Sequence, residues 1–140
     1  MCSSDLWNVN DMLSLRSAFN LTDAHVEGGT VAPQLTGKRP AQTPRWTVTG
    51  GIVATPDPLV TLEAYARYES VRWSDDQNTL RLSGVTIVDT RVSLHMTPKL
   101  DVYAAIDNAF DAKVGSARAA DQVLTIDAPR LFRAGVSYRY

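Results

Sequence analysis

The sequence contains little of what metal sites and active sites are usually built from. Its 140 residues include one cysteine, Cys2, and two histidines, His25 and His95, which lie far apart. An internal disulfide is therefore excluded, and a metal site held by Cys and His ligands is not expected. The stretch 75–78 lacks the glycine and the spacing of a calcium loop, and there is no Gly-x-Ser-x-Gly, His-Glu-x-x-His or phosphate-binding glycine loop. We predict no catalytic residues, no metal and no cofactor, and hence no enzyme.

Excess charge and long apolar runs are also missing. The formal net charge is −1, so the basic surface that nucleic acids require is absent and no nucleic-acid partner is predicted. No apolar run approaches the roughly 18 residues of a membrane-spanning helix, although membrane strands alternate and need no such run. Hydrophobic residues make up 44% and charged residues 21% of the chain, which is typical of a single folded domain.

The first six residues, Met1–Leu6, show neither the charged nor the apolar region of a secretory signal. They match what a common sequencing-adaptor end would encode if it were translated in frame. We therefore expect residues 1–6, Cys2 included, to be a non-native leader and residues 7–140 to be the natural sequence. A genuine cytosolic start is the alternative.

The last eleven residues, Arg130–Tyr140, alternate between two kinds of side chain. Because successive side chains of a β-strand point to opposite faces, this pattern predicts a strand with one apolar face and one wet face. About ten tilted residues are enough to cross a bilayer core of roughly 30 Å. The edge strand of a soluble sandwich can alternate in the same way. The apolar row consists of Phe132, Ala134, Val136, Tyr138 and Tyr140.

Five further segments alternate similarly, so the predicted fold class is all-β, with six long antiparallel up-and-down strands. A helix competes over Leu62–Arg67, which contains good helix formers, but the strict period of two favours a strand. The predicted strands are Leu13–Leu21 (with an extension to Val26 left open), Arg45–Ala54, Leu59–Val71, Val85–Thr97, Leu100–Asp107 and Arg130–Tyr140.

The connections between these strands are of two kinds. Thr55–Pro58 and Pro98–Lys99 are predicted to be tight turns, because proline cannot join a sheet ladder. Residues 27–44, 72–84 and 108–129 form longer loops, which places short turns at one end of the sheet and loops at the other. That asymmetry is typical of an outer-membrane barrel, and charge at mid-strand suits its water-filled lumen. The mid-strand charges are Glu63, Arg67, Asp89 and Arg91.

Several short motifs, taken in order, resemble those of one family. The stretch Asp107–Asp111, Asp-Asn-Ala-Phe-Asp, follows an alternating strand and resembles an element near the end of TonB-dependent outer-membrane receptors. The aromatic end of the last strand resembles the assembly signal of bacterial outer-membrane barrels. Further segments that resemble this family, in its order, are Gly37–Pro40, Thr43–Arg45, Val88–Val92 and Ala128–Arg130.

The resemblance implies that the six strands are the C-terminal segment of a transmembrane barrel of about 22 strands, without its plug domain. It implies a location in the outer membrane of a Gram-negative-type bacterium. The implied partners are outer-membrane lipid, the remainder of the barrel and plug, TonB acting through the plug, and the barrel-assembly machinery. The intact receptor would take up a scarce ligand, most often a ferric siderophore, which six open strands cannot do alone.

The resemblance also suggests roles for individual residues. The row Phe132, Ala134, Val136, Tyr138 and Tyr140 would be the barrel-assembly signal. The family's turn motif would comprise Asn108, Phe110 and Asp111. We expect the side chains of Asn108 and Asp111 to accept backbone N–H bonds at a strand end rather than to bind ligand. Aromatic girdles at the membrane interfaces are expected from Trp46, Tyr68 and Tyr138, whereas no ligand-contact residue is identified.

Two alternatives stay open. Another outer-membrane barrel, porin-like or adhesin-like, could share the terminal signal, but it would not explain Asp107–Asp111. A soluble β-sandwich or small barrel acting as a binding module would instead pack its apolar rows against each other. It would then be a water-soluble monomer, whereas a membrane barrel segment would precipitate without detergent.

Overall fold

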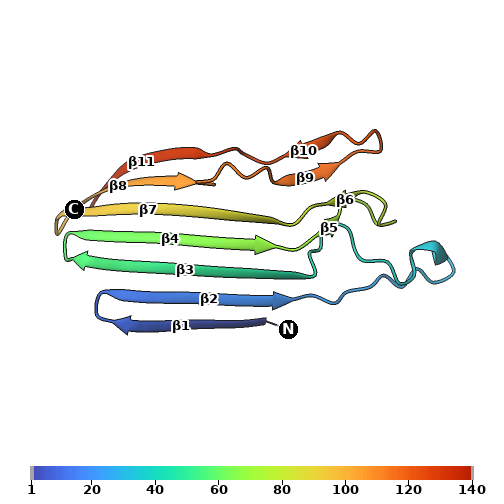
Figure 1. Ribbon diagram of the computed structural model, residues 1–140, viewed down its shortest axis with the longest axis horizontal. Helices are drawn as coiled ribbons and strands as arrows, with labels where there is room; N and C mark the ends of the chain where they lie inside the picture. Colours follow the sequence, from blue (N-terminus) through green and yellow to red (C-terminus); the bar gives the residue numbers. More distant parts are fainter. Residues whose placement is uncertain (1, 140) are drawn as a thin grey trace.

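The computed structural model describes residues 2–139. Its main feature is one seven-stranded antiparallel sheet with the strand order β1-β2-β3-β4-β7-β8-β11, seen side by side in Figure 1. The strands of this sheet are β1 (Cys2–Asn10), β2 (Leu13–Leu21), β3 (Trp46–Asp57), β4 (Val60–Glu69), β7 (Val85–Thr97), β8 (Leu100–Asp107) and β11 (Leu131–Tyr138). Within the described range, β1 and β11 each have one unpaired edge, so the sheet is open.

Every long strand expected from the alternation is present, and the helix that competed over Leu62–Arg67 is absent, because β4 covers that stretch. The register keeps the two kinds of side chain on separate faces. Ile52, for example, pairs with Leu15 on one side and Ala64 on the other, and these residues belong to what we call the apolar face. The opposite polar face carries pairs such as Glu63 with Arg91.

The sheet has seven strands and not six, because residues 2–10 form the additional strand β1. Alternation does not reveal this strand, since its register places Ser3 and Asp5 on the apolar face, opposite Phe19 and Ser17. Trp7, in contrast, lies beside Leu15 on the apolar face. Backbone pairing with β2 therefore forms a strand whose first half lacks the side-chain pattern.

Three hairpins, β1–β2, β3–β4 and β7–β8, turn at the same end of the sheet (Figure 1). In each hairpin the incoming strand has a register shift just before the turn, between Asn8 and Asn10, Ala54 and Asp57, and His95 and Thr97. The predicted turn at Thr55–Pro58 is therefore wrong in its bounds. Strand β3 continues through Pro56 to Asp57, because a bulge removes Pro56 from the ladder where its missing N–H would matter.

The long connections gather at the opposite end and contain structure of their own (Figure 1). They hold a 3-10 turn η1 (Pro33–Leu35) and two small hairpins, β5 (Arg72–Trp73) with β6 (Arg81–Leu82), and β9 (Gly115–Arg118) with β10 (Leu124–Ile126). The buried apolar residues of the described chain are Leu82, Val114 and Ala105. Leu82 and Val114 belong to the loop region and Ala105 to β8, while the apolar face of the sheet stays uncovered. No helix within residues 2–139 has the length and apolar character to cross a membrane.

Candidate functional site

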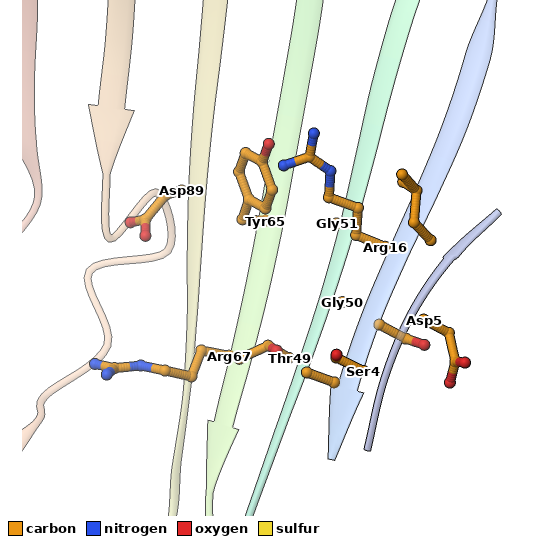
Figure 2. Close-up of a pocket in the computed structure, with 12 residues that line it drawn as sticks. Ser4, Asp5, Arg16, Thr49, Gly50, Gly51, Tyr65, Arg67 and Asp89 are labelled. Atoms are coloured by element: carbon orange, nitrogen blue, oxygen red, sulfur yellow. The ribbon is translucent and has the colours of Figure 1, made fainter. Parts of the chain in front are cut away.

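The polar face is hollowed where β1, β2, β3 and β4 run side by side. A depression of about 680 Å³ is lined there by side chains that include Arg16, Thr49, Tyr65, Arg67 and Asp89. Figure 2 shows Arg16 extending across Gly51 toward Tyr65, while Arg67 points away toward the loops. This concave wall, polar and charged, is the surface that a water-filled interior or a second domain would meet.

The charged side chains of this wall pair both across strands and along them. The Arg91 Nε lies 3.8 Å from the Glu63 carboxylate on the neighbouring strand and donates a 3.1 Å hydrogen bond to Ser93. The Arg91 guanidinium also lies 4.1 Å from the centre of the Tyr103 ring. Arg67 pairs with Glu69 at 3.2 Å. Sequence spacing correctly placed Glu63, Arg67, Asp89 and Arg91 on one face, but it could not show these partners.

Two tyrosines cover glycines on the same face. Tyr65 lies opposite Gly51 and Tyr103 opposite Gly135 in the register. A Cβ atom on Gly51 would lie 2.5 Å from the Tyr65 ring, and one on Gly135 would lie 2.6 Å from the Tyr103 ring. Each ring therefore rests on the bare backbone of the next strand, a packing that only glycine allows.

At the short-turn end, a chain of hydrogen bonds joins β4, β7 and β8 to the segment that follows β11. The imidazole of His95 contacts the Thr61 hydroxyl at 3.0 Å through Nε2 and the Asp101 carboxylate at 2.7 Å through Nδ1. Arg139, just beyond β11, donates to the other Asp101 oxygen at 3.0 Å. Within residues 2–139, no three His, Cys, Asp or Glu side chains are grouped as a metal site would require.

At the loop end, Arg72 ties three connections together. Its guanidinium donates to Glu69 at 2.8 Å, to Gln42 at 3.1 Å and to the Gly115 carbonyl at 2.8 Å. A second bridge runs through Ser74, whose hydroxyl accepts the Arg118 N–H at 2.9 Å. These contacts hold residues 22–45, 70–84 and 109–130 as one cluster. Sequence reasoning missed Arg72, because its partners lie up to 43 residues away.

The predicted turn motif follows β8. Asn108 has a positive φ of 49° and Asp111 one of 53°, values that Asn and Asp tolerate better than most residues. The Asn108 side-chain oxygen accepts the Ala112 N–H at 2.8 Å, and the Asp111 carboxylate accepts the Arg130 N–H at 2.9 Å. Phe110, in contrast, is 77% exposed. The motif thus sets the backbone that leads from β8 toward β11.

The predicted terminal row lies on the apolar face. Phe132, Ala134, Val136 and Tyr138 pair with Ile106, Ala104, Val102 and Leu100 of β8, respectively. Tyr140 lies outside the described residues. The four described residues of the row are apolar, exposed and next to the free edge of the sheet, where a neighbouring strand or lipid can contact them.

The aromatic residues of the apolar face are spread along the sheet. Tyr138 lies beside the short turn, and Phe19, Trp46 and Tyr68 lie toward the loops, whereas Trp7 and Phe132 share one register row with Ile52. Aliphatic side chains such as Ile52, Leu62 and Val92 lie on the same face and are exposed. An exposed apolar face that carries both aliphatic and aromatic side chains is typical of the lipid-facing surface of a membrane barrel.

Comparison with known proteins accounts for this arrangement. The family model described as "TonB dependent receptor-like, beta-barrel" matches residues 3–109. The chain belongs to the TonB-dependent receptor family. Members of this family are outer-membrane β-barrels of Gram-negative bacteria that act as receptors and transporters and interact with TonB and a plug domain. A comparison with curated protein sequences gives no match.

Solved receptors share the fold. The siderophore receptor PiuA from Acinetobacter baumannii is 17% identical with a TM-score of 0.80, over 96% of this chain and 20% of that one. The ferric yersiniabactin uptake receptor FyuA from Yersinia pestis is 13% identical with a TM-score of 0.79, over 98% and 23%. The ferric preacinetobactin receptor BauA from Acinetobacter baumannii is 22% identical with a TM-score of 0.75, over 95% and 20%. The chain therefore spans about a fifth of the length of these TonB-dependent receptors.

Proposed function

We propose that this chain is the C-terminal part of the barrel wall of a receptor that imports a scarce ligand across the outer membrane, driven through TonB. The observation that carries the proposal is the open sheet with one lipid-facing and one polar face in a chain of this family. An open sheet encloses no lumen and leaves ladder groups unpaired at both edges, which hydrocarbon does not tolerate. Transport therefore belongs to the intact receptor, and this segment supplies wall and loops.

A ferric siderophore is the proposed ligand class. The support comes from the names of the similar structures, which include receptors for siderophores, ferric yersiniabactin and ferric citrate. In this proposal iron is cargo, and the chain itself performs no chemistry. The loop cluster around Arg72 would face the outside and contribute to the mouth through which the ligand enters.

The remaining roles are proposed from placement. The polar face would contact the plug, and the apolar face would contact outer-membrane lipid. Phe132, Ala134, Val136, Tyr138 and Tyr140 would be read by the barrel-assembly machinery, and Asn108, Phe110 and Asp111 would be the family's turn motif. Residues 1–6 would be a non-native leader, which is supported by the polar side chains of Ser3 and Asp5 on the apolar face.

The test begins with the source DNA upstream of the Trp7 codon. We expect the reading frame to continue through further alternating strands to a plug and a signal peptide. The intact receptor, expressed in cells that lack their own siderophore receptors, should then take up iron-55 from a panel of ferric siderophores only when TonB is present. Uptake of none of them, or uptake that survives removal of TonB, would contradict the proposal.

A further inference from the structure

A small pocket lies at the loop end of β3 and β4, separate from the hollow of the polar face. We call it the rim pocket; its volume is about 340 Å³. Its lining residues are Arg39, Arg45, Trp46, Tyr68, Ser70, Val71 and Trp73. Tyr68 pairs with Val48, and Trp46 lies two residues before Val48, so both rings belong to the apolar face. The rim pocket therefore sits where the lipid-facing surface meets the outer loops.

Its walls are held in place by the protein alone. Trp46 and Ser70 exchange hydrogen bonds, from the Trp46 N–H to the Ser70 hydroxyl at 3.1 Å and from the Ser70 N–H to the Trp46 carbonyl at 3.0 Å. The Trp46 and Tyr68 rings pack at 5.1 Å between centroids. Arg39 is held by its backbone, which exchanges two 2.8 Å hydrogen bonds with the Asn78 side chain. Little reorganisation is needed before a ligand can bind.

The charge of the pocket is positive and poorly compensated. None of its lining residues is acidic. Arg39 has one ion-pair partner, Asp23, at 3.8 Å, and the Asp23 side chain is 62% exposed. Within residues 2–139, the Arg45 side chain has no hydrogen-bond or ion-pair partner. Two guanidinium groups beside aromatic rings suit a phosphate group that is joined to apolar chains.

We propose that the rim pocket binds the phosphorylated headgroup of an outer-leaflet lipid. Arg39 and Arg45 would hold the phosphate, and Trp46 and Tyr68 would pack against the first carbons of the acyl chains. A lipid is favoured over a soluble anion because the two rings lie on the lipid-facing surface, at the depth where amphipathic aromatics meet headgroups. The site adds to the transport role a fixed contact between the receptor wall and the outer leaflet.

The test measures lipid binding to the full chain in zwitterionic detergent micelles, by fluorescence of its tryptophans, two of which line the pocket. Phosphatidic acid should bind at least ten times more tightly than phosphatidylcholine. Arg45→Gln should weaken that binding about three- to ten-fold, and Arg39→Gln with Arg45→Gln by more. Arg16→Gln is the matched control, because Arg16 is an exposed arginine on the polar face, and it should leave the affinity unchanged.

Equal affinity for the two lipids would overturn the proposal. So would an equal loss in the Arg16 and Arg45 variants, which would indicate general attraction to charge. Inorganic phosphate that binds as tightly as phosphatidic acid would show an anion site rather than a lipid site. Because the Arg45 side chain makes no hydrogen bond or ion pair within residues 2–139, its single variant stays informative even if the double variant unfolds.

Discussion

Gly50 and Gly51 are neighbours in β3 with opposite surroundings. A Cβ on Gly51 would meet the Tyr65 ring at 2.5 Å, whereas one on Gly50 would meet nothing within 4 Å. We expect Gly51→Ala to destabilise the chain in micelles by about 1–2 kcal/mol through overpacking. Gly50→Ala should be neutral or stabilising by up to about 1 kcal/mol, because alanine restricts the unfolded chain. Urea unfolding of both variants measures the difference.

The combination Gly51→Ala with Tyr65→Ala separates a clash from a backbone effect. If the ring is the obstacle, the double variant should lose less stability than the two single variants added together, because contacting residues are not additive. A strictly additive result would mean that Gly51 is needed for its own backbone and not for Tyr65.

The hydrogen bonds of Asp75 make the stability of the loop at residues 70–84 depend on pH. Burial raises the pKa of Asp75, but hydrogen bonds from the N–H groups of Leu80 and Thr79 and from the Thr79 hydroxyl outweigh burial and lower the pKa below its usual value. Since the folded pKa lies below the unfolded value of about 3.9, this stabilisation is complete above that pH and is lost as pH falls through the folded pKa.

Amide proton shifts of Thr79 and Leu80, followed by NMR, should therefore titrate with a midpoint below about 3.9. Asp75→Asn should abolish this titration and speed hydrogen exchange at both amides. Asp76→Asn is the matched control, since the neighbouring Asp76 accepts a bond from Ala41 instead. A midpoint at or above the unfolded value would contradict the arrangement of donors around Asp75.

Among the elements, the loops depend on Arg72 more than on their own small hairpins. Arg72 and Arg67 both contact Glu69, but Arg72 is buried and Arg67 is exposed. Arg72→Gln should cost roughly 3 kcal/mol, because it leaves buried partners unpaired. Arg67→Gln should cost at most about 1 kcal/mol, as exposed ion pairs do.

Limited proteolysis distinguishes the two variants further. With Arg72→Gln, cleavage should accelerate together in residues 22–45, 70–84 and 109–130, while the long strands stay protected. Acceleration in a single loop would show that the three connections are independent, and that Arg72 does not join them.

The sequence predicts the long strands well, because each strand has one polar face and one apolar face. Polar and apolar side chains therefore alternate along it with a period of two. It fails for β1, where Ser3 and Asp5 break the alternation and pairing with β2 alone forms the strand. It also fails for β5, β6, β9 and β10, which are only two to four residues long. Arg72 and the rim pocket could not be predicted, because they arise where residues from different loops meet.

For the whole molecule, a new charge should be unfavourable on the apolar face and tolerated on the polar face. Ile52 lies mid-strand on the apolar face, and Thr49 lies three residues earlier on the polar face. In the intact receptor, Ile52→Lys should make membrane insertion less favourable by roughly 2–4 kcal/mol, because lysine then faces hydrocarbon. Thr49→Lys should be close to neutral. Recovery of the two variants of the intact receptor in floated phosphatidylcholine vesicles measures the effect.

A water-soluble, monomeric chain with cooperative unfolding in the absence of detergent would contradict this view of the sheet. In such a protein the apolar rows would be packed against one another, and both lysine variants could be handled in buffer. We expect precipitation instead, for the wild-type chain and for the Thr49 variant alike.

The repeated bulge before each short turn has an evolutionary consequence. In all three hairpins the incoming strand carries the extra residue, at the same end of the sheet. The three hairpins are thus equivalent units. In each of them the second strand keeps the polar and apolar side chains on the same faces as the first strand. A gene duplication that copied one hairpin would add two strands to the sheet and keep every side chain on its original face.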